Sequence, residues 1–248
     1  MNASEYANLE RVERTHWYYA GKRVLVAAWI QRARAPQATD LLLDCGAGTG
    51  LFAAEMAAHC RVMVLDDHEE ALRMLHRRFQ PEQILSLAGD QVPLPDASLD
   101  YVTALDVLEH TPDDAAVVRG FHRLLKPGGV AVVTVPAGMA LWSDWDVALH
   151  HFRRYSRPQL QALFPDQAWE TVHVNYTNVP VYPAVWLVRK WRRWFPAKKA
   201  AARAEDQVPP AWLNRLMQTW FVRLGLVRGL RFPFGVSLIL VARKRVSR

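Results

Sequence analysis

The stretch LLLDCGAGTG, residues 41–50, runs from a short apolar segment directly into three glycines. Continuous apolar runs of this length are typical of strands buried on both faces. Gly46, Gly48 and Gly50 permit positive φ and a close approach of the backbone to a ligand. The helix expected after them points its first N–H groups at a negative or polar group. The stretch therefore predicts a glycine turn that holds a nucleotide-like ligand.

The residues around the glycines narrow the choice of ligand. No Lys follows Gly50, as a triphosphate-binding P-loop requires, and the third glycine comes one residue too early for the dinucleotide pattern GxGxxG. Asp44 precedes the turn, where its carboxylate would repel a pyrophosphate but suits an α-amino group. The turn thus favours the amino-acid end of S-adenosylmethionine, and an NAD-dependent oxidoreductase is the alternative.

Two further acidic residues follow predicted strands. Asp66 closes the strand pattern RVMVLDD (61–67), and Asp90 closes ILSLAGD (84–90). Ligands of open α/β sheets bind at the carboxyl ends of the strands, where Asp66 is placed for ribose hydroxyls and Asp90 for the adenine amino group. Each Asp taken alone is equally well explained as a helix N-cap or a solvated loop residue.

Strand and helix patterns alternate as far as Pro136. After residues 41–45, strand patterns occur at 61–67, 84–90, 99–107 and 130–137, with helix patterns between them. This rhythm predicts βαβ units, and hence an α/β fold with a parallel sheet and helices on both faces. We expect four regions: an N-terminal helical lid (1–38), an α/β core (39–178), a basic, aromatic helical insert (179–234) and a final strand (235–248).

Four motifs in this order resemble those of class I S-adenosylmethionine-dependent methyltransferases, in the branch that acts on small molecules. They are LLLDCGAGTG, VLDD, GDQVPLPDASLDYVTALDVLEH and LLKPGGVAVVTVP, within residues 39–136. The resemblance implies a Rossmann-like sheet of about seven strands, mostly parallel with the last antiparallel, and S-adenosylmethionine as cofactor with S-adenosylhomocysteine as product. Gly46 and Gly48 would line the methionine end, and Asp106 and Val107 the pocket floor. The predicted cofactor contacts are Asp44, Gly46, Gly48, Asp66, Asp67, Asp90, Gln91, Asp106 and Val107.

The acceptor side is predicted around His110 and the segment LWSDWDVALHHFRRYS (141–156). Methyl transfer is an in-line displacement that needs a positioned acceptor and in some cases a base, but neither metal nor covalent nucleophile, and we expect no metal. The candidate catalytic residues are His151, Tyr155 and His110. A bacterial subset of the family is similar in its W..D…H.RRY and E..HW segments, and the candidate substrate contacts are Trp142, Arg153, Arg154, His16 and Trp17. The alternative for each residue is a structural corner, in which Asp146 pairs with Arg154.

Positive charge is concentrated in the last quarter of the chain. Residues 1–183 carry 16 Lys+Arg and 22 Asp+Glu, a balance of −6, whereas residues 184–248 carry 15 against 2, a balance of +13. Trp and Arg alternate with helical spacing in the insert, a pattern that suits an anionic membrane surface contacted through residues 184–231. A lid over the pocket is the first interpretation of the insert, with membrane or amphiphilic-substrate contact compatible with it, and nucleic acid is not expected because no recognised module accompanies the charge.

The absence of an apolar N-terminal h-region and of a long apolar run predicts a cytoplasmic protein, with peripheral contact at the inner membrane face left open. These patterns predict an S-adenosylmethionine-dependent methyltransferase that acts on an O, N or C atom of a small or lipid-like metabolite, without a metal or a covalent intermediate. Besides the NAD-dependent oxidoreductase, a non-catalytic, membrane-associated protein that binds S-adenosylmethionine remains an alternative.

Overall fold

The computed structural model describes residues 3–89, 91–194 and 207–246. Its strands form one sheet of the order β3-β2-β1-β4-β5-β7-β6 within these ranges, and β7 runs antiparallel to both of its neighbours. The strands are β1 Leu41–Cys45, β2 Arg61–Leu65, β3 Ile84–Leu85, β4 Leu99–Leu105, β5 Leu125–Pro136, β6 Trp169–Thr177 and β7 Ser237–Lys244. The predicted fold class, with its antiparallel final strand, is confirmed.

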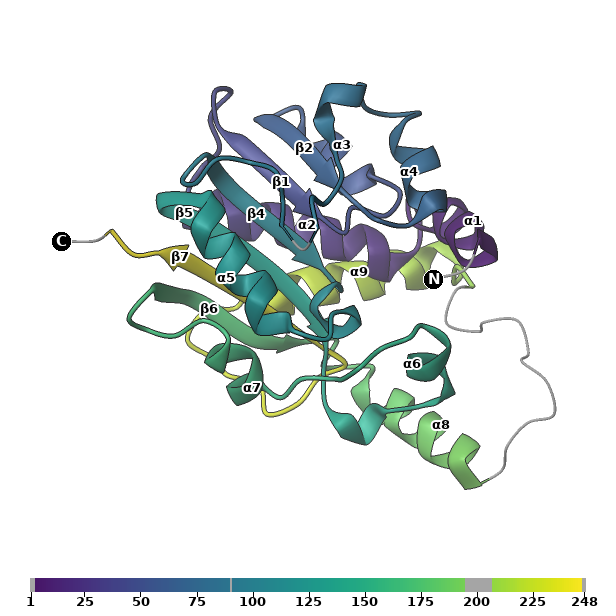
Figure 1. Ribbon diagram of the computed structural model, residues 1–248. Helices are drawn as coiled ribbons and strands as arrows, with labels where there is room; N and C mark the ends of the chain where they lie inside the picture. Colours follow the sequence, from purple (N-terminus) through teal and green to yellow (C-terminus); the bar gives the residue numbers. More distant parts are fainter. Residues whose placement is uncertain (1–2, 90, 195–206, 247–248) are drawn as a thin grey trace.

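Helices cover both faces of the sheet (Figure 1). Side chains of α2, α3 and α9 pack on one face, and those of α5 and α7 on the other. The helices are α1 Ala3–Val12, α2 Trp17–Ala33, α3 Leu51–Met56, α4 Glu69–Leu75, α5 Asp114–Leu124, α6 Asp144–Ala148, α7 Arg157–Ala162, α8 Tyr182–Trp194 and α9 Ala211–Gly225; short 3-10 turns are η1 Pro81–Gln83, η2 Leu108–His110 and η3 Met139–Leu141. No helix among the described residues is both long and apolar enough to span a bilayer.

The N-terminal region is partly a layer of the core. Leu25, Val26, Trp29 and Ile30 of α2 are buried against the sheet. Burial of four large apolar side chains makes this part of α2 integral to the fold. The lid expected for residues 1–38 stays a prediction for α1 and the first turn of α2.

The third strand is shorter than its sequence pattern suggests. Strand geometry ends at Leu85, and Ala88 and Gln91 then form an isolated antiparallel bridge. The expectation of a strand through residue 90 is therefore wrong, because this edge strand pairs with β2 at only two positions. Asp90 itself lies outside the described residues.

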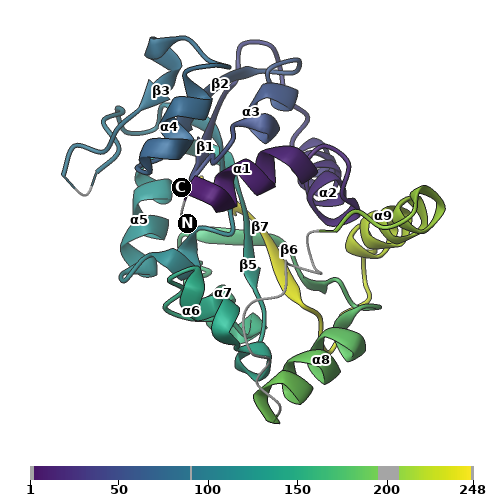
Figure 2. The ribbon, with the colours of Figure 1, turned by 90° about the vertical axis from the view of Figure 1, so that its right-hand side faces the viewer.

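The two helices of the insert lie in different places (Figure 2). Helix α9 packs along α2, where Gly21 and Gly225 permit close contact: a Cβ on Gly21 would lie 2.7 Å from Phe221 Cδ1. Helix α8 lies instead beside η3, and Arg189 donates a hydrogen bond to the carbonyl of Leu141. Among the described residues, the segment 179–234 is therefore two separate packing elements.

Candidate cofactor and acceptor site

The glycine turn after β1 has the backbone that its sequence predicts. Gly46, Gly48 and Gly50 have φ of 69°, 57° and 75°, in the left-handed region that side chains disfavour. A Cβ on Gly46 would lie 2.5 Å from Val107 Cγ2, so the turn packs directly on Val107, which is expected to form part of the pocket floor. A Cβ on Gly48 would meet nothing within 4 Å. The turn therefore presents open space at Gly48, where a ligand can approach the backbone.

Asp44 lies buried beneath this turn. It faces Thr103 across the β1–β4 pairing, and the Thr103 hydroxyl donates to Asp44 Oδ1 at 2.7 Å. Burial, reinforced by the negative charge of Asp66, raises the pKa of Asp44 to about 7, although the hydrogen bond from Thr103 opposes the shift. A cationic amino group placed beside Asp44 would stabilise its charged form, which fits the methionine end of S-adenosylmethionine.

Asp66 braces the turn from the end of β2. Its two carboxylate oxygens accept hydrogen bonds from the N–H groups of Gly48, at 2.9 Å, and His68, at 3.0 Å. Each oxygen keeps acceptor capacity for a ribose hydroxyl. Asp67, which follows Asp66 after β2, and Gln91 are both exposed.

Two residues of α2 that were not among the predicted site residues contact Asp106. Lys22 Nζ lies 2.6 Å from Asp106 Oδ2, and the Tyr18 hydroxyl lies 3.5 Å from the same oxygen. Burial would raise the pKa of Asp106, but the charge of Lys22 and the hydrogen bonds from Lys22 and Thr134 together hold that pKa below its ordinary value. Tyr18 and Lys22 are four residues apart in α2, and this helical spacing is the only signal in the sequence that pairs them.

The junction between α1 and α2 is tied to the glycine turn. The Thr49 hydroxyl donates to Glu13 at 2.5 Å, and Arg78 lies 3.4 Å from the same carboxylate. His16 caps α2: its Nδ1 accepts from the Tyr18 N–H at 3.3 Å, and the residue is buried. His16 is therefore placed as a structural cap.

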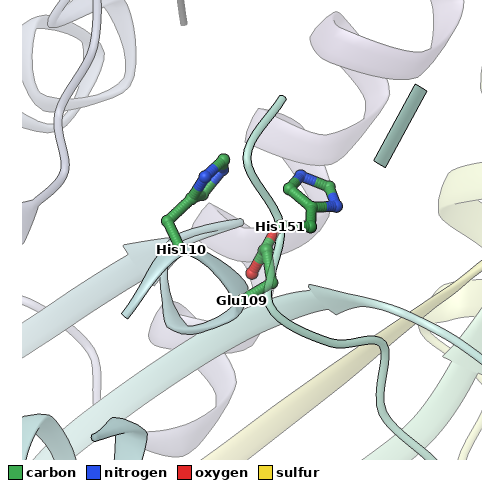
Figure 3. Close-up of side chains that lie close together, drawn as sticks. All are labelled: Glu109, His110 and His151. Carbon is green, nitrogen blue, oxygen red and sulfur yellow. The ribbon is translucent and has the colours of Figure 1, made fainter. Parts of the chain in front are cut away.

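Glu109, His110 and His151 form a cluster next to the floor (Figure 3). One ligand-type atom from each lies within 4.8 Å of the others. The cluster forms because the Phe152 N–H donates to the carbonyl of Glu109 at 2.8 Å, which fixes the segment after α6 against η2. Glu109 is only 1% exposed, and its carboxyl group has no hydrogen-bond partner on another described residue.

Asp146 orients His151 within this cluster. Asp146 Oδ1 lies 2.9 Å from His151 Nδ1 and accepts from Arg154 Nε at 2.7 Å. Burial would raise the pKa of Asp146, but the His151 hydrogen bond and the Arg154 charge hold it near 2. The Asp146–Arg154 pair of the structural alternative is thus present, and it leaves Arg154 buried and engaged. Since Nδ1 faces a carboxylate, Nε2 of His151 is the nitrogen left for a reacting group.

Burial favours the uncharged forms of the other two members of the cluster. Burial and the neighbouring His151 lower the pKa of His110 to about 4. Burial, together with the charge of Asp106, raises the pKa of Glu109 well above its usual value. Two imidazole nitrogens and a carboxyl oxygen are also ligands that zinc and iron accept. Among the described residues, this cluster is therefore a candidate metal site.

Two of the predicted residues are engaged outside this cluster. The Tyr155 hydroxyl donates to Asp114 Oδ2 at 2.7 Å, and burial raises the pKa of this tyrosine well above its ordinary value. Arg153 lies 2.8 Å from the same carboxylate and donates to the carbonyl of Pro112. Trp142 is half-buried after η3. The structure thus brings together His110 and His151 but assigns Tyr155 and Arg153 to a corner beside α5.

Together, the sheet order, the glycine turn and the buried acid beneath it are those of a class I methyltransferase fold. Residues 43–133 match the family model described as a methyltransferase domain. Residues 43–133 therefore form a methyltransferase domain of the S-adenosylmethionine-dependent class, and S-adenosylmethionine is its cofactor.

Curated relatives share this part of the chain. A probable S-adenosylmethionine-dependent methyltransferase of Mycobacterium tuberculosis is 29% identical over 134 residues, 53% of this chain and 49% of that protein. A ubiquinone biosynthesis O-methyltransferase of Thiobacillus denitrificans is 37% identical over 107 residues, 41% of this chain and 46% of that protein. The chain spans about half the length of the curated relatives it matches.

Solved structures extend the likeness in fold over nearly the whole chain. Phosphoethanolamine N-methyltransferase 2 of Haemonchus contortus, in complex with S-adenosyl-L-methionine, superposes with a TM-score of 0.64 at 16% identity, covering 99% of this chain and 58% of that one. A putative methyltransferase of Haloferax volcanii, in complex with its Trm112 activator, gives 0.60 at 17% identity, covering 99% and 95%. At this identity the likeness concerns the fold.

Proposed function

We propose that the protein transfers a methyl group from S-adenosylmethionine to an O, N or C atom of a small or lipid-like metabolite by in-line displacement. One observation carries the proposal: the glycine turn, with Asp44 beneath it, packs on the floor residue Val107, and the Glu109–His110–His151 cluster follows that floor directly. A donor site and a polar acceptor site are thereby contiguous, as displacement requires.

The residues around the turn fit the bound cofactor in the following way. Asp44 holds the α-amino group, Gly48 permits close approach of the methionine end, and Asp66 with Asp67 takes the ribose hydroxyls. Asp90 and Gln91 stay assigned to the adenine as in the sequence prediction. When bound, the cofactor supplies an electrophilic methyl group on a sulfonium.

His151 is the proposed general base for an acceptor that carries a proton. Asp146, ionised because its pKa is about 2, accepts a hydrogen bond from the Nδ1–H of His151 and stabilises the imidazolium that forms, while Nε2 takes the proton of the acceptor. Arg154 balances the buried charge of Asp146. His110 lies across from His151, with ring centroids 4.6 Å apart, and is proposed to orient the acceptor as a neutral imidazole.

Calorimetry of the full chain tests the donor half of the proposal. S-adenosylhomocysteine is expected to bind and NAD is not; binding of NAD alone would establish the oxidoreductase alternative. Methyl release in the presence of candidate acceptors then separates an enzyme from a non-catalytic binding protein. The catalytic proposal would be contradicted if the protein bound S-adenosylhomocysteine but transferred no methyl group to any small or lipid-like acceptor.

We also propose peripheral contact between residues 184–231 and an anionic membrane surface, on the cytoplasmic side. The support is exposed aromatic and aliphatic surface on α8, at Trp186, Leu187 and Trp191, beside basic residues such as Lys190. Amphipathic helices of this composition bind at lipid interfaces. Co-sedimentation with phosphatidylglycerol vesicles, and none with phosphatidylcholine vesicles, is the expected result. If a double variant, Trp191→Ala with Leu187→Ala, still sedimented fully with the vesicles, α8 would not be the membrane contact.

A further inference from the structure

An apolar cavity lies between α9 and the connection from β6 to α8. Its volume is ≈ 380 Å³, within the range of roughly 300–1,000 Å³ typical of small-molecule sites. Trp17 and the α9 side chains Leu216, Met217 and Trp220 line it, together with Asn178. Apart from Asn178, every residue around it is apolar.

The wall formed by α9 is held rigidly. The Trp17 N–H donates to Asn214 Oδ1 at 2.8 Å, and Trp29 Nε1 donates to the carbonyl of Gly225 at 2.9 Å. These bonds fix both ends of α9 on α2. Leu216 and Trp220 line the cavity and are 47% and 53% exposed, so no other described side chain buries them. Large exposed apolar patches of this kind mark binding surfaces.

One polar atom points to the chemistry of the occupant. Asn178 is 6% exposed, and its Oδ1 is buried without a hydrogen-bond partner among the described residues. Asn178 also has φ of 58°, a left-handed conformation for a residue other than glycine. A buried acceptor without a donor is unfavourable, and a ligand O–H or N–H would satisfy it. The cavity thus fits an apolar body that carries one hydrogen-bond donor.

The cavity lies one layer of side chains from the cofactor floor. Phe221 lines it and also borders a small buried void with Tyr18 and Lys22, the two residues that contact Asp106. The Tyr18 and Phe221 rings are 5.9 Å apart. The cavity therefore adjoins the cofactor floor, with the Phe221 and Tyr18 side chains between them.

We infer that this cavity binds the hydrocarbon body, an alkyl, acyl or prenyl chain, of the methyl acceptor, with a hydroxyl or amide N–H of that molecule donating to Asn178. The inference rests on the proposed methyl transfer and assigns its acceptor to the amphiphilic class.

A displacement assay on the full chain tests this inference. The fluorescent fatty acid 11-(dansylamino)undecanoic acid is the probe, and n-alkanols of six to ten carbons are the competitors. Each added methylene is expected to tighten binding about fourfold until the cavity is full. Met217→Trp, which fills the cavity, is expected to weaken decanol at least tenfold. Trp212→Ala, on the same helix and 70% exposed but outside the cavity, is the matched control and is expected to change nothing.

Asn178→Gly keeps the left-handed backbone and removes the amide. The natural protein is expected to prefer decanol over nonyl methyl ether, which lacks the donor, by about fivefold, and the variant to show no preference. S-adenosylhomocysteine binding, measured in parallel, is expected to be equal in all variants. If the natural protein did not bind S-adenosylhomocysteine, the proposed function itself would be contradicted. Intact cofactor binding with no dependence on chain length, or equal effects of Met217→Trp and Trp212→Ala, would overturn this inference alone.

Discussion

Cofactor binding is expected to depend on pH through Asp44. In the free protein its pKa is about 7, whereas an α-ammonium group in contact with it favours the carboxylate and lowers that pKa. Binding therefore releases a proton wherever Asp44 is protonated beforehand, and affinity is lost as pH falls through 7. Between pH 7.0 and 5.5 the ionised fraction falls from about one half to about 3%, so affinity for S-adenosylhomocysteine is expected to fall about fifteenfold.

Isothermal titration in two buffers of different ionisation enthalpy measures both consequences. At pH 7.0 about half a proton should be released for each S-adenosylhomocysteine bound. Thr103→Val removes the hydrogen bond that lowers the Asp44 pKa, so the midpoint of the pH profile should move upward. Asp44→Asn should bind more weakly at pH 7 and show a flat profile, which controls for other titrating groups. A natural protein with a flat profile, or an Asp44→Asn variant that keeps the slope, would refute the assigned role of Asp44.

Three further predictions concern the acceptor cluster and the turn. His151→Asn should lower the rate of methyl transfer to a proton-bearing acceptor by about 100-fold or more, with the affinity for S-adenosylhomocysteine unchanged. His150→Asn, at an exposed neighbouring residue, is the control and should change neither quantity. Equal losses of rate in the two variants would contradict the role of His151 as base. Gly48→Ala should weaken S-adenosylhomocysteine binding because φ is 57° at this position. A backbone strain of about 1–2 kcal/mol corresponds to about a tenfold loss of affinity. Gly120→Ala, in open space on α5, is the control and should leave the affinity unchanged. Chelation with EDTA should leave methyl release unchanged if the cluster acts through His151; loss of activity restored by Zn²⁺ or Mn²⁺ would show that the cluster binds a metal.

Much of the donor half was determined by local sequence. The positive φ of the glycines, the alternation of buried strands with helices and the positions of Asp44 and Asp66 at strand ends depend on residue type and short spacing, which a sequence displays directly. Parallel strands joined by helices must then bring their carboxyl ends to one edge. The fold class and the cofactor turn followed for that reason.

The acceptor half depended on contacts between residues far apart in the chain. The segment 141–156 offers two His, two Arg and a Tyr, and nothing in their spacing reveals that Asp114 engages Arg153 and Tyr155. Only the packing of that segment on η2 placed His151 beside a buried Glu109.

Long-range packing likewise divided the insert between two sites. Its composition is similar throughout, yet α9 packs on α2 through Gly21, and α8 lies at η3. The sequence by itself therefore determined where the cofactor turn lies and which fold carries it. The tertiary structure decided which polar groups remain available to an acceptor, because that depends on which of them already have partners in space.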